Sequence, residues 1–313
     1  MKISVAIPTY KRPNYLFTAL RSVCTQTMRP WEIIVVCRSG DSPSEEVVDR
    51  LRVEYPQVNI RIEFVVSSGF LPPIIKAIET ASGEVLALLD DDAEAPCGWL
   101  LQISRGYVSD GVAGVGGRCV NYFDGIKQHY PPVRRVGRLL WLGKPIGNMY
   151  CDCKFNSSVG VDFLMGGNCS YRLEVIRKTI PDMRLSENVS FHWEIDVGLR
   201  IKRLGYQLIF DPGIAVKHYS APREIEGLRT INFDGMFWSN YNFVIIMKKH
   251  MPPLRFTCFL VYSFLVGWSG SPGIVWLLFR LFRGHKIEWK DLVYSSFLGR
   301  LKGVLTFKKL IRK

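Results

Sequence analysis

Three consecutive carboxylates, Asp90-Asp91-Asp92, form the sharpest chemical signal in this sequence. They stand where the apolar stretch from Val85 to Leu89 ends. Three carboxylates at one strand end repel each other unless a positive charge lies among them. Hard oxygen ligands suit Mg²⁺ or Mn²⁺, ions that commonly take phosphate oxygens as further ligands. The triplet therefore predicts a metal–diphosphate site, and the alternative is a solvated acidic turn that caps the helix expected near Pro96.

Three other motifs contain residues that could do chemistry. Glu194 and Asp196 open an expected helix, where acids are also stabilised by the helix dipole without any function. Gly166-Gly167-Asn168 could let a ligand approach the backbone closely, or could be an ordinary turn. His218 ends a strand, where it could contact a metal or a phosphate or serve only the structure. Each motif alone leaves both readings open.

Apolar strands alternate with amphipathic helices around these motifs. Strands are expected at 3–10, 32–37, 60–66, 84–90, 112–120 and 207–216, and helices at 13–26, 44–55, 72–80, 97–107 and 194–204. A helix-like stretch is expected from Tyr171, and 121–159 reads as a long irregular loop. Continuous apolar strands between helices predict an α/β fold with a mostly parallel sheet covered on both faces. Ligands bind at the carboxyl ends of such strands.

The basic charge of this chain is concentrated at its end. The 313 residues carry a formal charge of +13, and 48% of them are hydrophobic, which suits a large core and argues against disorder. Residues 248–313 contain thirteen Lys and Arg against two acids, or +11, which leaves +2 for the first 247 residues. A nearly neutral main part argues against a nucleic-acid-binding protein.

The eight cysteines include no CxxC pair, since the nearest two, Cys151 and Cys153, are separated by one residue. Neither a zinc ribbon nor a disulfide scaffold fits this spacing. Most of the cysteines lie among apolar residues, so we expect reduced thiols and a cytoplasmic protein. The first residues run straight into a strand pattern and show no secretory signal.

The C-terminal segment combines apolar and basic residues. A run of twelve residues without charge, Thr257–Trp268, is followed by Ser269–Gly273 and the apolar Ile274–Phe279. Each apolar piece is shorter than the roughly 20 residues that cross a bilayer. Together with the basic charge they predict an interfacial helical hairpin at an anionic membrane surface. The alternative is a pair of core helices that close the main domain.

The order of the motifs resembles family 2 glycosyltransferases. The stretches that carry the resemblance are VAIPTYKRPNYLFTALRSV, EIIVV, ASGEVLALLDDDAEAPCGWL, FLMGGNCSYRLEVI and EIDVGLRIKRLGYQLIFDPGIAVKH. The resemblance covers about residues 1–223 and implies a GT-A-type fold. It implies a nucleotide-sugar half at 1–120 and an acceptor half at 121–223. The apolar and basic composition of the tail predicts a helical, basic, membrane-associating extension at 224–313.

The resemblance also implies roles for individual residues. Asp90 and Asp92 match the DxD carboxylates that hold Mn²⁺ or Mg²⁺, and we add His218 to this metal group. Pro8, Thr9 and Tyr10 match the donor side, to which we add Arg12, Asp41 and Asp91. Gly166, Gly167 and Asn168 match the acceptor side, to which we add Trp193. Glu194 falls where the family places its catalytic base, with Asp196 ordering the site.

The sequence departs from the family pattern at three places. Cys37–Asp41 stands where the family usually has Asp-Asp-Gly-Ser, so the aspartate that contacts the base is missing and a uracil donor is not implied. Ile74 and Ile75 replace the usual Arg-Asn pair, which leaves Lys76 or Arg38 to supply positive charge to the diphosphate. The Glu194 position commonly holds Asp.

The sequence therefore predicts an inverting, metal-dependent transferase. It would move a sugar from a nucleotide-diphosphate sugar to a hydroxyl of a glycan or glycolipid acceptor, in cell-surface polysaccharide or glycolipid synthesis. We expect it at the cytoplasmic face of the membrane as a peripheral protein. A sugar-nucleotide nucleotidyltransferase is the alternative enzyme, although no glycine-rich phosphate loop follows the first strand. A non-catalytic basic protein that binds membranes or nucleic acid is the third class.

Overall fold

The computed structural model describes residues 1–147, 149–185, 192–221, 233–287 and 289–310. Contacts within the chain divide it into two units. The first unit consists of Met1–Arg138, Ile146–Pro181 and Glu194–Ala221, and the second of Leu139–Pro145, Asp182–Trp193 and Pro222–Lys313. The domain boundary expected after residue 223 lies outside the described residues. The expected division at residue 120 falls within a strand, Val112–Phe123. Both boundaries stay predictions.

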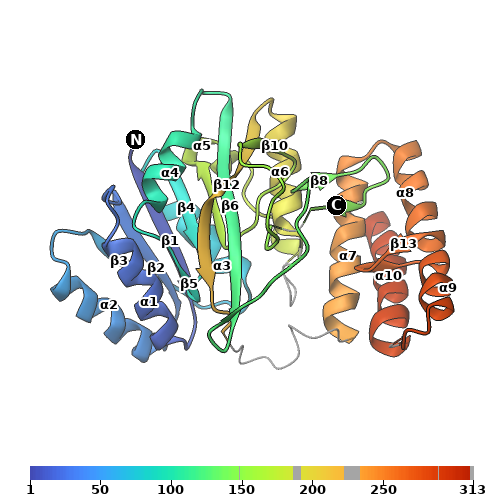
Figure 1. The fold of residues 1–313 in the computed structure, drawn as a ribbon, viewed down its shortest axis with the longest axis horizontal. Helices are drawn as coiled ribbons and strands as arrows, with labels where there is room; N and C mark the ends of the chain where they lie inside the picture. Colours follow the sequence, from blue (N-terminus) through green and yellow to red (C-terminus); the bar gives the residue numbers. More distant parts are fainter. Residues whose placement is uncertain (148, 186–191, 222–232, 288, 311–313) are drawn as a thin grey trace. The chain divides into compact units, whose positions relative to one another are not determined.

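The first unit is built on a ten-stranded sheet (Figure 1). Its main path has the order β10-β12-β6-β11-β4-β1-β2-β3, while β5 pairs with β12 and β7 with β6. The strands are β1 Ile3–Thr9, β2 Glu32–Arg38, β3 Ile60–Val65, β4 Val85–Leu89, β5 Ala93–Glu94, β6 Val112–Phe123, β7 Ile126–Lys127, β10 Val159–Val161, β11 Asn168–Arg172 and β12 Gln207–His218. The strands β1 to β4 are parallel to their neighbours in this group, which confirms the expected α/β fold.

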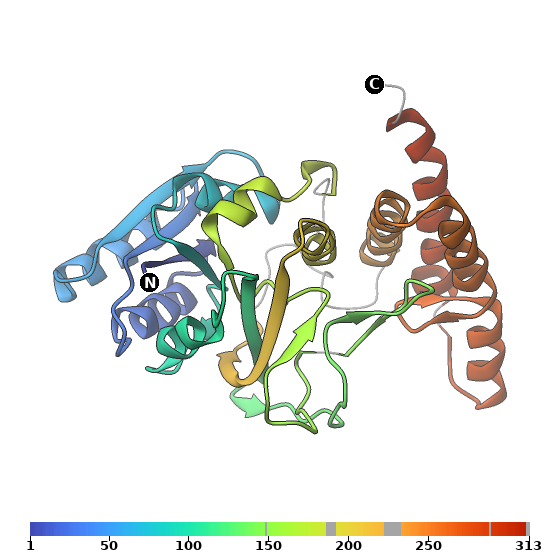
Figure 2. The ribbon, with the colours of Figure 1, turned by 90° about the horizontal axis from the view of Figure 1, so that it is seen from above.

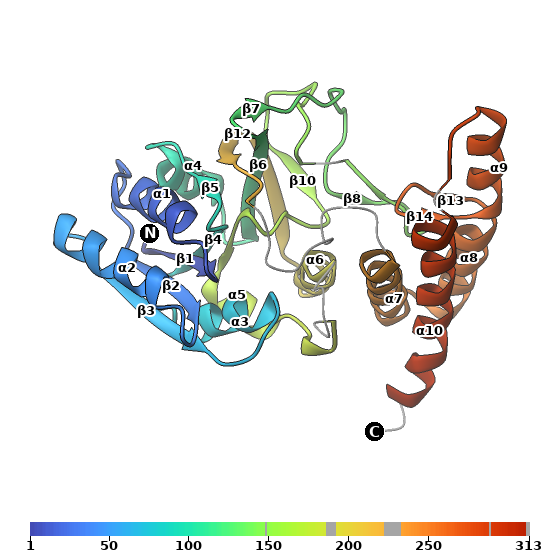
Figure 3. The same cartoon turned by 90° about the horizontal axis from the view of Figure 1, so that it is seen from below.

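Helices cover both faces of this sheet (Figure 2, Figure 3). They are α1 Pro13–Cys24, α2 Ser42–Glu54, α3 Leu71–Thr80, α4 Trp99–Gly106, α5 Leu173–Lys178 and α6 Trp193–Arg203. The chain crosses the sheet from β1 through β2 to β3 and then returns to form β4 on the other side of β1. Because each crossover is right-handed, α1 and α2 lie on one face of the sheet and α3 lies on the other. The return of the chain brings the carboxyl ends of β1 and β4 side by side, where a ligand can bind.

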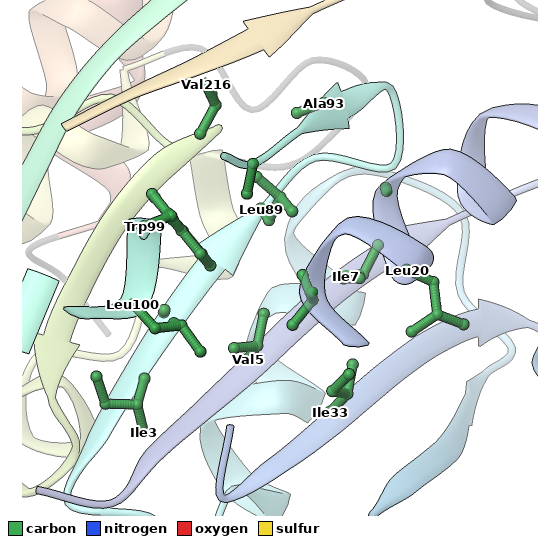
Figure 4. Packing of buried hydrophobic residues seen from close by; sticks show 14 of the residues in the cluster. Ile3, Val5, Ile7, Leu20, Ile33, Leu89, Ala93, Trp99, Leu100 and Val216 are labelled. Carbon is green, nitrogen blue, oxygen red and sulfur yellow. The ribbon is translucent and has the colours of Figure 1, made fainter. Parts of the chain in front are cut away.

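The main core lies between one face of the sheet and the helices α1, α2 and α4 (Figure 4). Ile3, Val5 and Ile7 point into it from β1 because alternate residues of a strand share one face. Leu16 and Leu20 meet them from α1, and both are fully buried. This apolar packing fixes the strand ends that hold the polar groups described below.

The region between β6 and α6 differs most from the sequence prediction. Residues 168–172 form β11, which pairs antiparallel with both β4 and β6, so the helix expected from Tyr171 begins only at Leu173. The loop expected at 121–159 contains β7, the start of β10 and a separate two-stranded sheet of β8 Arg138–Leu139 and β9 Pro145–Ile146. β11 escapes detection because its pattern is set by pairing partners far away in sequence.

The second unit consists mainly of helices. They are α7 Phe233–His250, α8 Pro253–Leu265, α9 Ile274–Phe282 and α10 Ser295–Leu310, with short helical turns at Met183–Leu185 and Trp289–Tyr294. The short strands β13 Gly267–Trp268 and β14 Ser271–Pro272 pair between α8 and α9. Arg300 of α10 is buried and donates to the carbonyls of Ser263 and Pro272, which ties α10 to these elements. Among the described residues, no helix combines the length and apolar character that crossing a membrane requires.

Candidate active site

A cluster of polar side chains lies at the carboxyl end of β4. β4 is buried along its whole length between β1 and β11, and the chain turns directly after it into the acidic triplet. β5 follows this turn and pairs with the end of β12, where Ala93 stands opposite His218. The pairing of two short segments that are distant in sequence therefore brings His218 to the carboxylates.

Asp90, Asp92 and His218 form a group that could hold a metal ion. Their ligand atoms lie within 4.8 Å of one another. His218 Nε2 is 3.2 Å from Asp92 Oδ1 and 3.7 Å from Asp90 Oδ2. Two carboxylates with one imidazole make a mixed oxygen and nitrogen donor set, which fits Mn²⁺ better than the all-oxygen preference of Mg²⁺.

His218 and Asp92 shift each other's pKa. Burial alone would lower the pKa of His218, but its hydrogen bonds to Asp90 and Asp92 raise the pKa to about 9. Burial would likewise raise the pKa of Asp92, but His218 and Arg12 outweigh it and lower the pKa to about 2. The backbone N–H of Ala221 also donates to Asp92 Oδ2 at 2.8 Å. A protonated His218 thus offsets part of the negative charge of the two carboxylates.

Asp91 points away from this group and binds the β1–α1 loop. Thr9 Oγ1 donates to Asp91 Oδ2 and Arg12 Nη1 to Asp91 Oδ1, both at 2.9 Å. Burial raises the pKa of Asp91 to about 6, although the guanidinium of Arg12 acts in the opposite direction. Arg12 Nη1 also lies 3.8 Å from Asp92 Oδ2. The expected donor residues Thr9, Arg12 and Asp91 are therefore brought together with the metal group.

Asp41 has an internal position in the structure. It is fully buried, and its Oδ2 accepts hydrogen bonds from the backbone N–H of Lys11 at 2.6 Å and from Ser44 Oγ at 2.7 Å. Lys11 has a φ of +52°, which only a firmly held loop sustains in a residue with a side chain. Asp41 thus fixes the loop that follows β1, and its role in binding the donor stays a prediction.

The two candidate cations for the diphosphate have different surroundings. Tyr10 directly follows Pro8 and Thr9, the last two residues of β1. The guanidinium of Arg38, at the end of β2, lies 5.0 Å from the ring centre of Tyr10. Lys76 Nζ instead pairs with Glu63 at 3.3 Å. The structure therefore favours Arg38 over Lys76 as a cation near the expected donor.

A glycine pair connects the metal group to Glu194. A Cβ atom on Gly167 would lie 2.5 Å from Asp90 Oδ2, so a side chain at this position would displace that carboxylate. The neighbouring Gly166 N–H donates to Glu194 Oε1 at 3.4 Å. Burial raises the pKa of Glu194 to about 7, and the negative charge of Asp90 adds to this rise. Asp90 thus lies beside Gly167 and Glu194 beside Gly166, so that one turn holds both carboxylates.

The remaining expected site residues point into the protein. Asp196 is fully buried, and its Oδ2 pairs with Arg200 Nη2 at 2.9 Å, one helical turn along α6. Trp193 is also buried. Asn168 is fully buried in β11, where it accepts from Trp99 Nε1 at 2.9 Å and donates to the carbonyls of Arg118 and Ile214. Their expected contacts with an acceptor, or their ordering of one, stay predictions.

We expect Asn168→Ala to lower the free energy of unfolding by about 2–4 kcal/mol. The substitution leaves the buried indole N–H of Trp99 and two backbone carbonyls without their partner, and each unsatisfied group costs about 1–3 kcal/mol before relaxation. Urea denaturation of both proteins would measure the loss. A change below about 0.5 kcal/mol would contradict the bonding role of Asn168.

Tyr150 is a site residue that sequence reasoning missed. Its ring centre lies 6.3 Å from that of His218. Burial, with the nearby negative charges of Asp90 and Glu194, holds the pKa of the phenol well above its usual range. A single tyrosine in an irregular segment carries no sequence signal, and only the folded loop brings its ring close to His218.

Comparison with known proteins shows the family of this chain. Residues 4–179 match the family model described as glycosyl transferase family 2. An uncharacterised glycosyltransferase of Bacillus subtilis is 37% identical over 93 residues, which are 29% of this chain and 33% of the relative. The GalNAc(5)-diNAcBac-PP-undecaprenol β-1,3-glucosyltransferase of Campylobacter jejuni is 29% identical over 119 residues, which are 38% of each chain. The matches thus span between 33% and 38% of the length of these relatives.

The structure of a mannosyltransferase from Pyrobaculum calidifontis in complex with GDP-Man and Mn²⁺ has a similar fold. The TM-score is 0.61 at 14% identity, over 97% of this chain and 87% of that chain. The mostly parallel sheet with its flanking helices is therefore of the expected GT-A type. Since the family model covers more than half of the residues, this chain belongs to glycosyl transferase family 2.

Proposed function

We propose that this protein transfers a sugar from a nucleotide-diphosphate sugar to an acceptor hydroxyl with inversion at the anomeric carbon. The observation that supports this most is the Gly166-Gly167 turn, which contacts Asp90 on one side and Glu194 on the other. A group suited to a cation and a carboxylate suited to accept a proton are thus held beside each other. Such a pair suits displacement of a diphosphate by a hydroxyl.

The proposed reaction is a single displacement. The acceptor oxygen forms a bond to the anomeric carbon while the bond from that carbon to the diphosphate oxygen breaks. Glu194 accepts the proton of the acceptor hydroxyl, and its pKa of about 7 is close to the value at which a general base works best near neutral pH. A divalent cation held by Asp90, Asp92 and His218, with Mn²⁺ before Mg²⁺, would offset the charge of the leaving diphosphate.

The proposed acceptor is a glycan or a glycolipid in cell-surface polysaccharide or glycolipid synthesis. The Campylobacter jejuni relative is named for an acceptor linked to PP-undecaprenol, and this supports a lipid-linked acceptor here. The basic charge of residues 248–313 supports a peripheral position on an anionic membrane surface, which we place at the cytoplasmic face.

Release of the correct leaving group tests the proposed reaction. Purified protein would be incubated with UDP-sugars and GDP-sugars, Mn²⁺ and an undecaprenyl-diphosphate-linked sugar, and the products separated. We expect acceptor-dependent formation of the nucleoside diphosphate. Pyrophosphate release from a sugar phosphate and a nucleoside triphosphate would instead show the nucleotidyltransferase. Formation of neither product, with intact binding of nucleoside diphosphates, would contradict the proposal for these acceptors.

We predict that Arg38→Ala weakens the binding of UDP or GDP in the presence of Mn²⁺ by about tenfold. Arg38 lies over Tyr10 at the end of β2, and a guanidinium bound to a phosphate or a base edge contributes about 1–3 kcal/mol. Calorimetric titration would give the dissociation constants. Lys76→Ala is the matched control, because Lys76 pairs with Glu63 and should leave affinity unchanged. Equal losses in both variants would contradict a specific role for Arg38.

A further inference from the structure

The helix α9 exposes its most apolar face to solvent. The outward side chains are Ile274, Val275, Leu278, Phe279, Leu281 and Phe282. Phe282 is 92% exposed and Leu278 60% exposed. No residue of α9 is buried, although the structure describes the whole helix. A water-soluble helix normally presents polar residues to solvent, so α9 has the reverse of the usual pattern.

The neighbouring helix α8 contributes a second apolar stripe. Its buried side chains include Phe256 and Phe259, while Leu254, Val261 and Leu265 are exposed. These three exposed leucine and valine residues follow the helical spacing of one face. α8 and α9 belong to the same unit and pack beside each other (Figure 3). Large exposed apolar areas of this kind mark interaction sites.

Basic residues border the apolar face of α9. The guanidinium of Arg280 lies 5.5 Å from the ring centre of Trp276, and that of Arg283 lies 4.4 Å from the ring centre of Phe279. Lys286 and Lys290 follow within eight residues of the end of the helix, and both are exposed. Long basic side chains can keep their charge at the polar boundary while their stems cover apolar surface.

We infer that the exposed face of α9, with its basic border, is a docking surface for a bilayer that contains anionic lipids. The inference deepens the proposed function, on which it rests for a lipid-linked acceptor. A helix of nine residues is about 14 Å long, which suits a position in the plane of the interface. The basic border complements anionic head groups. A second copy of this chain fits less well, because a symmetric contact would bring two borders of equal charge together.

Flotation of the full-length protein with vesicles tests this surface. The vesicles would contain either phosphatidylcholine alone or phosphatidylcholine with phosphatidylglycerol, without donor or acceptor. We expect the protein to float at least tenfold more with the anionic vesicles. The double variant L278E/F282E should lose at least nine-tenths of this binding, since it puts charge on the apolar face.

The matched control is V53E/V108E, which adds the same two charges at exposed valines of the first unit. It should float like the unchanged protein. Circular dichroism and sedimentation would confirm that both double variants are folded and report their oligomeric state. Absence of flotation by the unchanged protein, or equal flotation of all three proteins, would overturn the inference. A dimer that L278E/F282E dissociates, without flotation, would assign the face to a second copy instead.

The outcome is independent of catalysis. Binding of UDP or GDP with Mn²⁺ should be the same in L278E/F282E and in the unchanged protein, because α9 contains none of the expected donor residues. Normal flotation without any sugar transfer would contradict only the proposed function. Transfer to a lipid-linked acceptor without flotation would contradict only the docking surface.

Discussion

Replacing Glu194 by glutamine should reduce turnover by about 10²–10⁴-fold, the usual contribution of a general base. Glutamine keeps the size of the side chain and can still accept from the Gly166 N–H, but it cannot take a proton. Donor affinity should therefore change by less than about threefold, because the lost interaction belongs to the transition state. Rapid-quench turnover and calorimetric donor binding on the same preparations would separate the two effects.

The pH profile gives an independent readout of the same residue. A general base works when it is ionised, so the turnover of the unchanged protein should fall as pH drops through the pKa of Glu194. Burial sets this pKa at about 7 in the structure, and any cation near Asp90 would move it down because Asp90 contributes to the rise. The acid limb should therefore lie at or somewhat below pH 7. Its persistence in Glu194→Gln would contradict the assignment.

Asp196→Asn is the matched control on the same helix. Asp196 is fully buried and pairs with Arg200, so its substitution should lower the free energy of unfolding by about 1–3 kcal/mol. This is less than the loss of a fully buried ion pair costs, because solvent reaches the partly exposed Arg200. The folded fraction should still turn over within about tenfold of the unchanged protein. If Asp196→Asn instead shows the large loss of turnover and Glu194→Gln does not, Asp196 is the base.

Asp92→Asn should abolish the stabilisation of the protein by Mn²⁺. A ligand at one hundred times its dissociation constant stabilises the folded state by about 2.7 kcal/mol. Asp92 is one of two carboxylates in the candidate metal group, and an amide cannot supply its charge. The affinity for UDP or GDP should lose its dependence on Mn²⁺ as well. Thermal unfolding and nucleotide titration, each with Mn²⁺ and with EDTA, would measure both effects.

Asp91→Asn separates this effect from damage to the acidic turn. Asp91 is the adjacent carboxylate, but it bonds Thr9 and Arg12 rather than His218. Its variant should still be stabilised by Mn²⁺. An unchanged Mn²⁺ response in Asp92→Asn, or an equal loss in both variants, would contradict the assignment of the metal group.

The sequence by itself determined the α/β fold, the first four strands with their helices, and the family. These elements are readable because β1, β2 and β4 are buried on both faces and so appear as continuous apolar runs. The acidic triplet was placed correctly at the end of β4 because a strand buried on both faces cannot continue through three carboxylates. The local sequence pattern was sufficient to predict a strand wherever nearly all residues of that strand are buried.

The tertiary structure alone decided which polar residues face the site and which face the core. Asp90 and Asp91 are neighbours in sequence, yet one lies against Gly167 and the other bonds Thr9. Asn168 follows the glycine pair, but its buried side chain bonds Trp99 of α4 and the carbonyls of Arg118 and Ile214. Tyr150 lies near His218, although it comes from an irregular segment. The sequence also did not show that α9 is exposed to solvent. An apolar run reads alike whether it is buried or exposed, because burial depends on long-range packing that no local pattern encodes.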